Sequence, residues 1–298
     1  MFIATIRHEL KSARRERLPQ LILSVFLAMV TASSFIGWMT HKTVSSVYNE
    51  AVREQLTTQP NPFLQVPALD SVKNVVIYTA LIGALFAVIV GVRSSLRDRK
   101  SGVLNLIFSR PVGKRQYVAA KYIGILSWLG IVIIIAAILT WASLWIIQGH
   151  PPSLSNSQRL LLFFGISWLF MLPFTALGMM SGLFAKQETT ALLLPILVWV
   201  LITFIVPQLG TAEEPISFLT PIPSQPVSQG VFFQINRSLL QPISYTDHYK
   251  ELSGASLSLS QDHQVAKQSL EFALIIGVTV VSLIVFSPKL IRSGELYE

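Results

Sequence analysis

Cysteine is absent from the 298 residues of this chain, and charged residues make up only 13% of it. The absence of cysteine excludes a disulfide framework, a thiol nucleophile and a thiolate metal site. Average soluble domains carry about 25% charged residues, so this chain has few of the groups that keep a protein surface in water. Charge of either sign is missing altogether from six long apolar runs.

Each uncharged run is long enough to cross a membrane as a helix, which takes about 20 apolar residues. A helix also satisfies its own backbone hydrogen bonds, as lipid requires. Because the runs are continuous rather than alternating, they do not fit a transmembrane barrel. We therefore predict an all-α, polytopic membrane protein with one transmembrane domain, 1–298. Its six spans are Leu18–Thr40, Asn74–Val92, Tyr122–Gly149, Leu160–Ala185, Thr189–Ala212 and Phe272–Pro288.

The basic residues gather on one side of these spans. Segments 1–17, 93–121, 186–188 and 289–298 hold sixteen Lys/Arg and six Asp/Glu, whereas the other connections hold seven and nine. The positive-inside rule then predicts a multi-pass protein of the inner or plasma membrane with both termini in the cytoplasm. This topology accounts for the basic pI, and no motif supports binding to nucleic acid.

Three segments outside the spans have a helical pattern. Residues 1–17 are predicted to form an amphipathic helix in the membrane interface, with Arg7 and Lys11 on its basic face. The first half of His41–Lys73 could continue the first span. The external loop 211–271 opens with a Pro-rich stretch, followed by two short helices, Val231–Leu240 and Ser244–Leu252. Ser244 and Asp247 make a capping box, and we expect the loop to form a small extracytoplasmic cap between spans five and six.

Catalytic motifs are also missing. The chain has no G-x-S-x-G, no H-E-x-x-H, and no P-loop, since Gly113-Lys114-Arg115 lacks the upstream glycine and the hydroxyl. Two acid–His pairs, Asp247-His248 and Asp262-His263, could meet around a metal, but such pairs arise by chance and no metal site is expected. The spans hold no ionisable group, which disfavours a proton or ion pathway. We predict that the chain is not an enzyme, and that any energy for its work comes from another subunit.

The most informative segment is 93–121, between the second and third spans. It carries eight Lys/Arg and one acid, Asp98, and encloses a short apolar block, Val103–Phe108, closed by Ser109-Arg110-Pro111. Six helical residues rise only about 9 Å, far less than a bilayer. An apolar segment that cannot span, held at the basic face of a membrane, needs another surface to cover it. We therefore predict a protein partner at this segment.

Small residues form two further patterns. Gly178 and Gly182 make a G-x-x-x-G in the fourth run, and Gly83, Ala87 and Gly91 form a small face on the second. Such faces allow helices to approach closely. The pattern fits packing within one subunit as well as a seam between two copies.

These features together resemble the ABC-2 type permeases, the membrane subunits of type V ABC exporters. The resemblance rests on His8-Glu9-Leu10 in a basic N-terminal helix, on six spans with both ends inside, and on the loop after the second span. In that loop the family has an acid, a glycine four residues on, a short apolar helix, a proline and basic residues. Asp98 stands where glutamate is more usual. Within the family, size and layout are most similar to the permease that serves nitrous-oxide-reductase maturation. The loop pattern is filled here by Asp98, Gly102, Val103–Phe108, Pro111, Arg115 and Lys121.

The resemblance implies that the apolar block is a coupling helix that docks on a separate ABC ATPase. ATP and Mg²⁺ would bind that partner, and this chain would bind no cofactor. A second permease copy, or a paralogous permease, would complete the complex, with spans two and five lining the pathway. The resemblance assigns ATPase docking to Arg97, Asp98, Gly102, Val103, Leu104, Leu106, Ile107, Phe108, Arg110 and Pro111.

The resemblance predicts ATP-driven export of an unidentified substrate. The uncharged spans favour something apolar or amphipathic, such as a lipid or a peptide. The alternative is an assembly that moves no substrate and passes mechanical force to an extracytoplasmic partner through the 211–271 loop. An intramembrane enzyme ranks last, because no catalytic constellation is visible.

Overall fold

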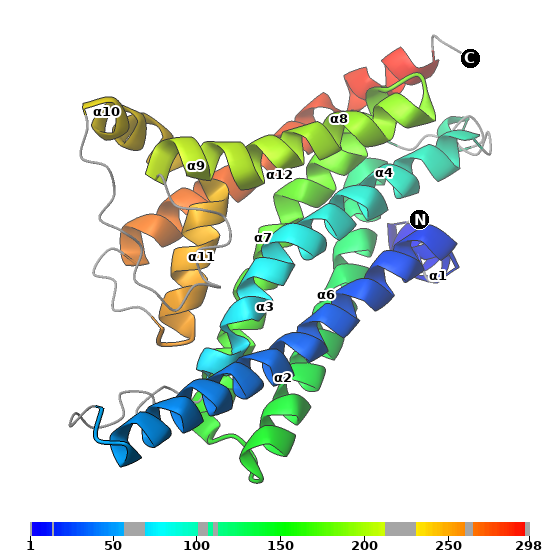
Figure 1. Ribbon diagram of the computed structural model, residues 1–298. Helices are drawn as coiled ribbons and strands as arrows, with labels where there is room; N and C mark the ends of the chain where they lie inside the picture. Colours follow the sequence, from blue (N-terminus) through cyan, green and yellow to red (C-terminus); the bar gives the residue numbers. More distant parts are fainter. Residues whose placement is uncertain are drawn as a thin grey trace.

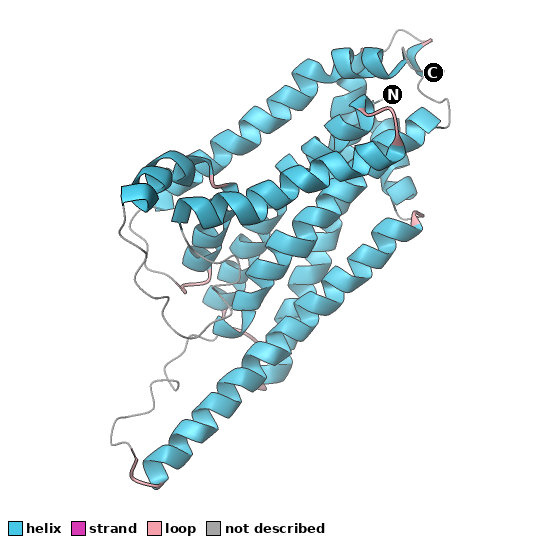
Figure 2. Cartoon of the chain, turned by 45° about the horizontal axis from the view of Figure 1, so that its top comes forward, coloured by secondary structure: helices cyan, strands magenta, loops and turns pink. Residues whose placement is uncertain are grey.

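A computed structural model describes residues 2–13, 15–56, 69–100, 107–109, 113–211, 231–259 and 265–295. Within these ranges every regular element is a helix, as Figures 1 and 2 show. The all-α prediction is confirmed. Six helical segments are long and apolar enough to cross a membrane, and each corresponds to one predicted run: Arg17–Arg53, Asp70–Arg99, Lys114–Gln148, Leu154–Phe184, Glu188–Ile205 and Val265–Ile291.

Four spans are single helices: α2 (Arg17–Arg53), α6 (Lys114–Gln148), α7 (Leu154–Phe184) and α12 (Val265–Glu295). The second and fifth spans are interrupted, each by a π-helical turn. The second comprises η2 (Asp70–Val72), α3 (Lys73–Tyr78), η3 (Thr79–Gly83) and α4 (Ala84–Lys100). The fifth comprises α8 (Glu188–Val200), η4 (Leu201–Ile205) and α9 (Val206–Thr211). The remaining helices are α1 (Phe2–Ala13), α10 (Val231–Leu240), η6 (Gln241–Ile243) and α11 (Tyr245–Ser256).

The helix of the first span, α2, continues well past the predicted end at Thr40 and reaches Arg53, as expected for the first half of His41–Lys73. At its other end, α2 begins beside α1, the end of α4, and the starts of α6 and α8. We call this end of the bundle, where α12 also finishes, the basic end (Figures 1 and 2). Both described chain ends therefore lie at the same end of the bundle.

The centre of the bundle is the crossing of α4 and α7, where the two backbones touch. A Cβ built on Gly178 would lie 2.3 Å from the Val88 carbonyl oxygen, and one on Gly91 would lie 2.4 Å from that of Thr175. One turn further along α7, a Cβ on Gly182 would lie 2.9 Å from the Val92 carbonyl oxygen. Gly178 and Gly182 thus lie against α4 of the same subunit, because only hydrogen atoms fit between the two helices.

The described part of the 211–271 loop differs from the cap that we expected. Helix α11 is packed inside the bundle, and the Tyr245 hydroxyl donates at 3.3 Å to the carbonyls of Leu169 and Phe170, midway along α7. The ring of Tyr245 stacks on Phe170 and on Phe272 of α12, with centroids 5.1 and 4.8 Å apart. Tyr249 is fully buried, and its hydroxyl lies 2.9 Å from Ser167 Oγ. Aromatic burial therefore draws α11 inward, between α7 and α12.

Helix α11 also brings ionisable groups into a bundle whose spans have none in their apolar runs. Asp247, His248 and Lys250 are all buried, and His248 Nε2 lies 3.4 Å from Glu271 Oε2. The predicted capping box is wrong, because Ser244 Oγ donates to Asp247 Oδ2 at 2.5 Å and makes no hydrogen bond to the backbone of the first turn. A buried carboxylate needs a donor more than an N-terminal N–H group needs an acceptor.

Helix α11 meets the two interrupted spans. It packs against α3 of the second span and against η4 of the fifth, where Thr246 Oγ1 donates to the Ile202 carbonyl at 3.3 Å. A π-helical turn inserts an extra residue, displaces the backbone bonds and often marks a functional position. The segment from the loop thus sits where the second and fifth spans depart from α-helical geometry.

Substitution of Gly178 by alanine tests the α4–α7 contact. The added Cβ must push two backbones apart, which should cost about 1–3 kcal/mol and lower the thermal midpoint. Gly165, also in α7, is the matched control, since a Cβ there meets nothing within 4 Å. Gly165→Ala should leave stability unchanged or raise it by up to about 1 kcal/mol. Tryptophan fluorescence during heating in detergent measures both, and equal midpoints would contradict the close crossing.

Candidate coupling site at the basic end of the bundle

The predicted docking segment follows α4 in the chain and precedes α6. Of the ten assigned residues, the structure describes Arg97, Asp98, Ile107 and Phe108. Ile107 and Phe108 are partly buried against the core. The others, Gly102, Val103, Leu104, Leu106, Arg110 and Pro111, lie outside the described residues.

Asp98 joins the two flanks of this segment. Its carboxylate is buried near the end of α4 and accepts hydrogen bonds from the Tyr117 hydroxyl and from Lys121 Nζ of α6. Tyr117 and Lys121 lie on one face of α6, because they are four residues apart. Arg97 Nε adds a contact 3.6 Å from Asp98 Oδ1. The sequence placed Asp98 in the docking pattern, and the structure directs its side chain into the subunit.

Glu9 of α1 completes the cluster and was not among the predicted site residues. It is only 2% exposed and lies 3.1 Å from Lys121 Nζ and 2.7 Å from Arg97 Nη2. Ser94 Oγ donates to it at 2.8 Å. Helix α1 comes close to α6 here, since a Cβ on Gly124 would lie 2.8 Å from that of Glu9. We call Glu9, Arg97, Asp98, Tyr117 and Lys121 the buried charge cluster.

A sequence signal for Glu9 existed. It is the only acid in the first turns of a basic amphipathic helix, at helical spacing from Ala13, which is also buried. The helix itself is confirmed, but its apolar face does not point inward as a whole, because Ile3 is 77% exposed. Arg7 and Lys11 are exposed, as the amphipathic pattern predicts.

Burial makes the charges of this cluster interdependent. Lys121 is 1% exposed, and an ammonium group out of water is tolerated only with close counter-charges and filled hydrogen bonds. Glu9 and Asp98 supply those charges from two different helices. Removing either carboxylate leaves a buried cation with incomplete compensation, so α1, α4 and α6 are held together as one unit.

A ring contact connects the docking segment to the cluster. Phe108 packs edge-on against Tyr117, with ring centroids 5.5 Å apart and planes at 80°. Lys114 Nζ lies 5.3 Å above the Phe108 ring. Because Tyr117 donates to Asp98, a displacement of the end of the segment reaches the buried charge cluster through one side chain.

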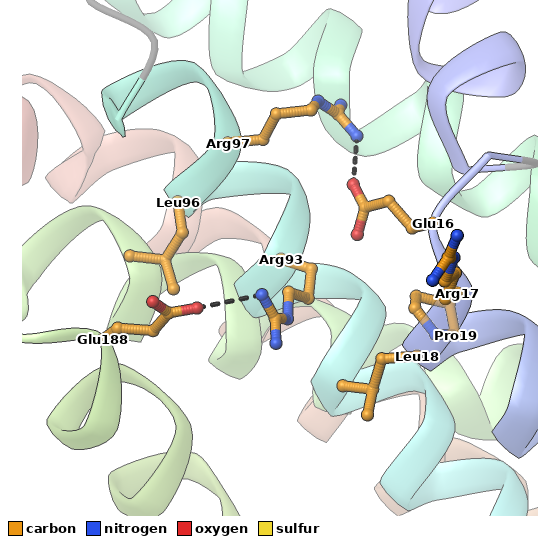
Figure 3. A pocket seen from close by; sticks show the side chains of 8 residues that line it. All are labelled: Glu16, Arg17, Leu18, Pro19, Arg93, Leu96, Arg97 and Glu188. Carbon is orange, nitrogen blue, oxygen red and sulfur yellow. Dashed lines mark hydrogen bonds and ion pairs between the residues drawn. The ribbon is translucent and has the colours of Figure 1, made fainter.

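Ion pairs extend from α4 to the first and fifth spans. Arg97 Nη1 lies 2.6 Å from Glu16 Oε1, just before α2, and Arg93 Nη1 lies 2.9 Å from Glu188 Oε1 at the start of α8. Arg99 donates to the carbonyl of Ala185. Between these elements lies a pocket of about 640 Å³, which we call the arginine pocket (Figure 3). Its lining residues are Glu16, Arg17, Leu18, Pro19, Arg93, Leu96, Arg97 and Glu188.

The described residues contain no group of three or more His, Asp or Glu placed to hold a metal ion. Asp247 and His248 are buried in α11, whereas Asp262 and His263 lie outside the described residues.

Substitution of Glu9 by glutamine tests the buried charge cluster. The change keeps the shape but removes one of two carboxylates at Lys121, and should cost about 3 kcal/mol of unfolding free energy. Arg7→Gln, on the exposed face of the same helix, should change stability by less than about 0.5 kcal/mol. Denaturant titration of the purified chain in detergent measures both. Combining Glu9→Gln with Lys121→Met should cost less than the sum of the two single changes, whereas additivity would contradict direct coupling.

The comparisons with known proteins agree with this architecture. A search of curated proteins found no match. A family model described as ABC-2 family transporter protein matches residues 3–287, from the first turn of α1 into α12. It covers five spans in full, most of the sixth, and the segment between α4 and α6. The chain therefore belongs to the ABC-2 transporter family and is a multi-pass membrane permease of the ABC transporter type.

Proposed function

We propose that this chain is the membrane subunit of an ATP-driven exporter, whose separate ABC ATPase docks on the segment between α4 and α6. In this proposal the basic end faces the cytoplasm, as the charge asymmetry predicts. ATP and Mg²⁺ bind the ATPase, and a second permease, identical or paralogous, completes the complex. The observation that carries the proposal is the buried charge cluster, which connects the flanks of the docking segment to three helices.

Docking would use both the apolar and the basic side chains of the segment. Apolar side chains such as Leu106 and Phe108 supply contact area, and Arg97 and Arg110 fit acidic groups that set the register. Arg97 is already held by Glu9 and Glu16, so its share in docking is to position the end of α4. The narrower likeness in layout to the permease that serves nitrous-oxide-reductase maturation belongs to this proposal as well.

Closure of the two ATPases on ATP would then move the docking segment as a rigid body. Phe108 transmits the displacement to Tyr117, and the buried charge cluster makes α1, α4 and α6 follow together. Helix α8 follows through Arg93–Glu188, an ion pair about one third exposed and therefore weaker than those in the cluster. This weaker tie would let the fifth span shift relative to the second.

The second and fifth spans would line the pathway, with α11 between them in the half of the bundle away from the basic end. Opening that half requires α11 to leave its aromatic contacts with Phe170 and Phe272. The π-helical turns η3 and η4 are the natural places for the adjustment, because their backbone bonds are already displaced.

Transmission of force to an extracytoplasmic partner is the second candidate. Two observations favour it: α11 fills the space between the spans, and α2 extends to Arg53 with mostly exposed side chains over its last turns (Figure 2). A packed interior and a protruding helix suit a lever better than an open pathway. Both candidates share the same ATPase docking.

Co-purification with a co-expressed ABC ATPase tests the shared step. Leu106→Asp/Phe108→Asp should release the ATPase, because carboxylates in an apolar docking groove cost several kcal/mol. Leu154→Asp is the matched control, since Leu154 is 77% exposed at the start of α7, away from the basic end. It should retain the ATPase. Thermal midpoints of all variants separate lost docking from lost folding, since Phe108 also packs on Tyr117.

Two results would overturn the proposal. One is a wild-type chain that holds no ATPase. The other is a folded double variant that holds the ATPase as well as wild type does.

A further inference from the structure

The arginine pocket shares Arg93, Arg97 and Glu188 with the ties between the helices, but its open volume has no part in the proposed coupling. It lies where the first and fifth spans begin, with Arg17, Leu18 and Pro19 of α2 on one side and Glu188 of α8 on the other (Figure 3). Arg93 of α4 stands between them. Its volume of about 640 Å³ falls in the range of small-molecule sites, roughly 300–1,000 Å³. The pocket therefore has room for a ligand at the boundary of the spans.

The positive charge of the pocket is only partly neutralised. Arg97 is bound by Glu16 within the pocket and by Glu9 beyond it, at 2.6 and 2.7 Å. Arg93 donates a hydrogen bond from Nη1 to Glu188, whereas its buried Nε has no hydrogen-bond partner among the described residues. The side chain of Arg17 is exposed, and its guanidinium group makes no hydrogen bond or ion pair within the described part of the chain. Three guanidinium groups thus line the pocket with two carboxylates, which leaves a surplus of positive charge there.

A surplus of guanidinium groups at a pocket favours a compact anion with several oxygens. The fork of an arginine matches a phosphoryl group or a carboxylate, and it is less strongly hydrated than an ammonium group. The carboxylates Glu16 and Glu188 disfavour a second bare anion deep in the pocket. One anionic group placed between Arg17 and Arg93 fits the charges that are present.

The surroundings of the pocket are apolar on the side of the spans. Leu18 and Leu96 line it, and the next turn of α2 exposes Leu21. These side chains lie in membrane-spanning helices, so an alkyl chain attached to the anion has an apolar surface beside it. The pocket therefore combines a charged site for a headgroup with an apolar surface for an alkyl chain.

We propose that the arginine pocket binds the phosphoryl headgroup of an anionic amphiphile from the adjacent membrane leaflet, with Arg17 and Arg93 as its ligands. The incoming anion competes with Glu188 for Arg93 and so loosens the tie between α4 and α8. The proposal rests on the proposed function in one respect, because it makes the amphiphile the class of substrate that the exporter loads. Binding of the amphiphile frees the fifth span from α4.

The test is direct lipid binding to the full-length chain, purified in a neutral maltoside detergent and measured by native mass spectrometry. Phosphatidic acid should bind about tenfold or more tightly than phosphatidylcholine with the same acyl chains. Inorganic phosphate at millimolar concentration should not displace it, because the free anion lacks the tail. Equal binding of the two lipids, or displacement by inorganic phosphate, overturns the proposal.

Two substitutions that break the same ion pair separate binding from a structural role. Arg93→Gln removes a ligand and should weaken phosphatidic acid binding about tenfold. Glu188→Gln removes the competing carboxylate and should tighten it several-fold. Arg7→Gln, the loss of an exposed arginine on α1, is the control and should change nothing. Equal weakening by Arg93→Gln and Glu188→Gln would show that the pair only holds the helices, and would overturn the proposal.

The binding measurement needs no ATPase, so its outcome is independent of docking. Lipid binding that follows the predicted order in a chain that holds no ATPase supports the site and overturns its role in loading an exporter. Retained docking without selective lipid binding overturns the site and leaves the proposed function standing.

Discussion

A single buried ammonium group organises the basic end of this protein. Lys121 lies between Glu9 of α1 and Asp98 of α4, and almost none of its surface reaches solvent. A charge so placed is stable only while both helices stay against α6. The segment between α4 and α6 connects these two helices, so both of its flanks are bound to the same group. In the function proposed above, force applied at this segment would move α1, α4 and α6 together.

The other helices of the bundle differ in how tightly they are packed against their neighbours. Helices α4 and α7 touch through backbone at Gly91 and Gly178, which leaves no side chain to rearrange. The fifth span is mostly exposed and is tied to α4 at the basic end by Arg93–Glu188. At the other end it meets α11. The fifth span, one of the least buried, thus carries both a partly exposed ion pair and a π-helical turn, which are features of segments with low local stability.

Two elements show how far the sequence could lead. Helix α11 was predicted as a helix from its pattern, and it was assigned to an external cap because it lies in the loop between the fifth and sixth spans. The structure places it inside because Tyr245 and Tyr249 find ring and carbonyl partners on α7, which no local pattern specifies. Likewise, α1 was predicted from its periodicity, whereas the partners of Glu9 lie 85 or more residues away.

The sequence by itself determined the number of apolar spans, the all-α class and the family. These follow from uninterrupted hydrophobicity and local charge, which act over one helix length. Only the tertiary structure decided which charges are buried together, which glycines meet a neighbouring backbone and where α11 lies. Those depend on pairings between distant residues, and in a membrane protein the cost of an unpaired charge or polar group selects among packings that hydrophobicity alone leaves equivalent.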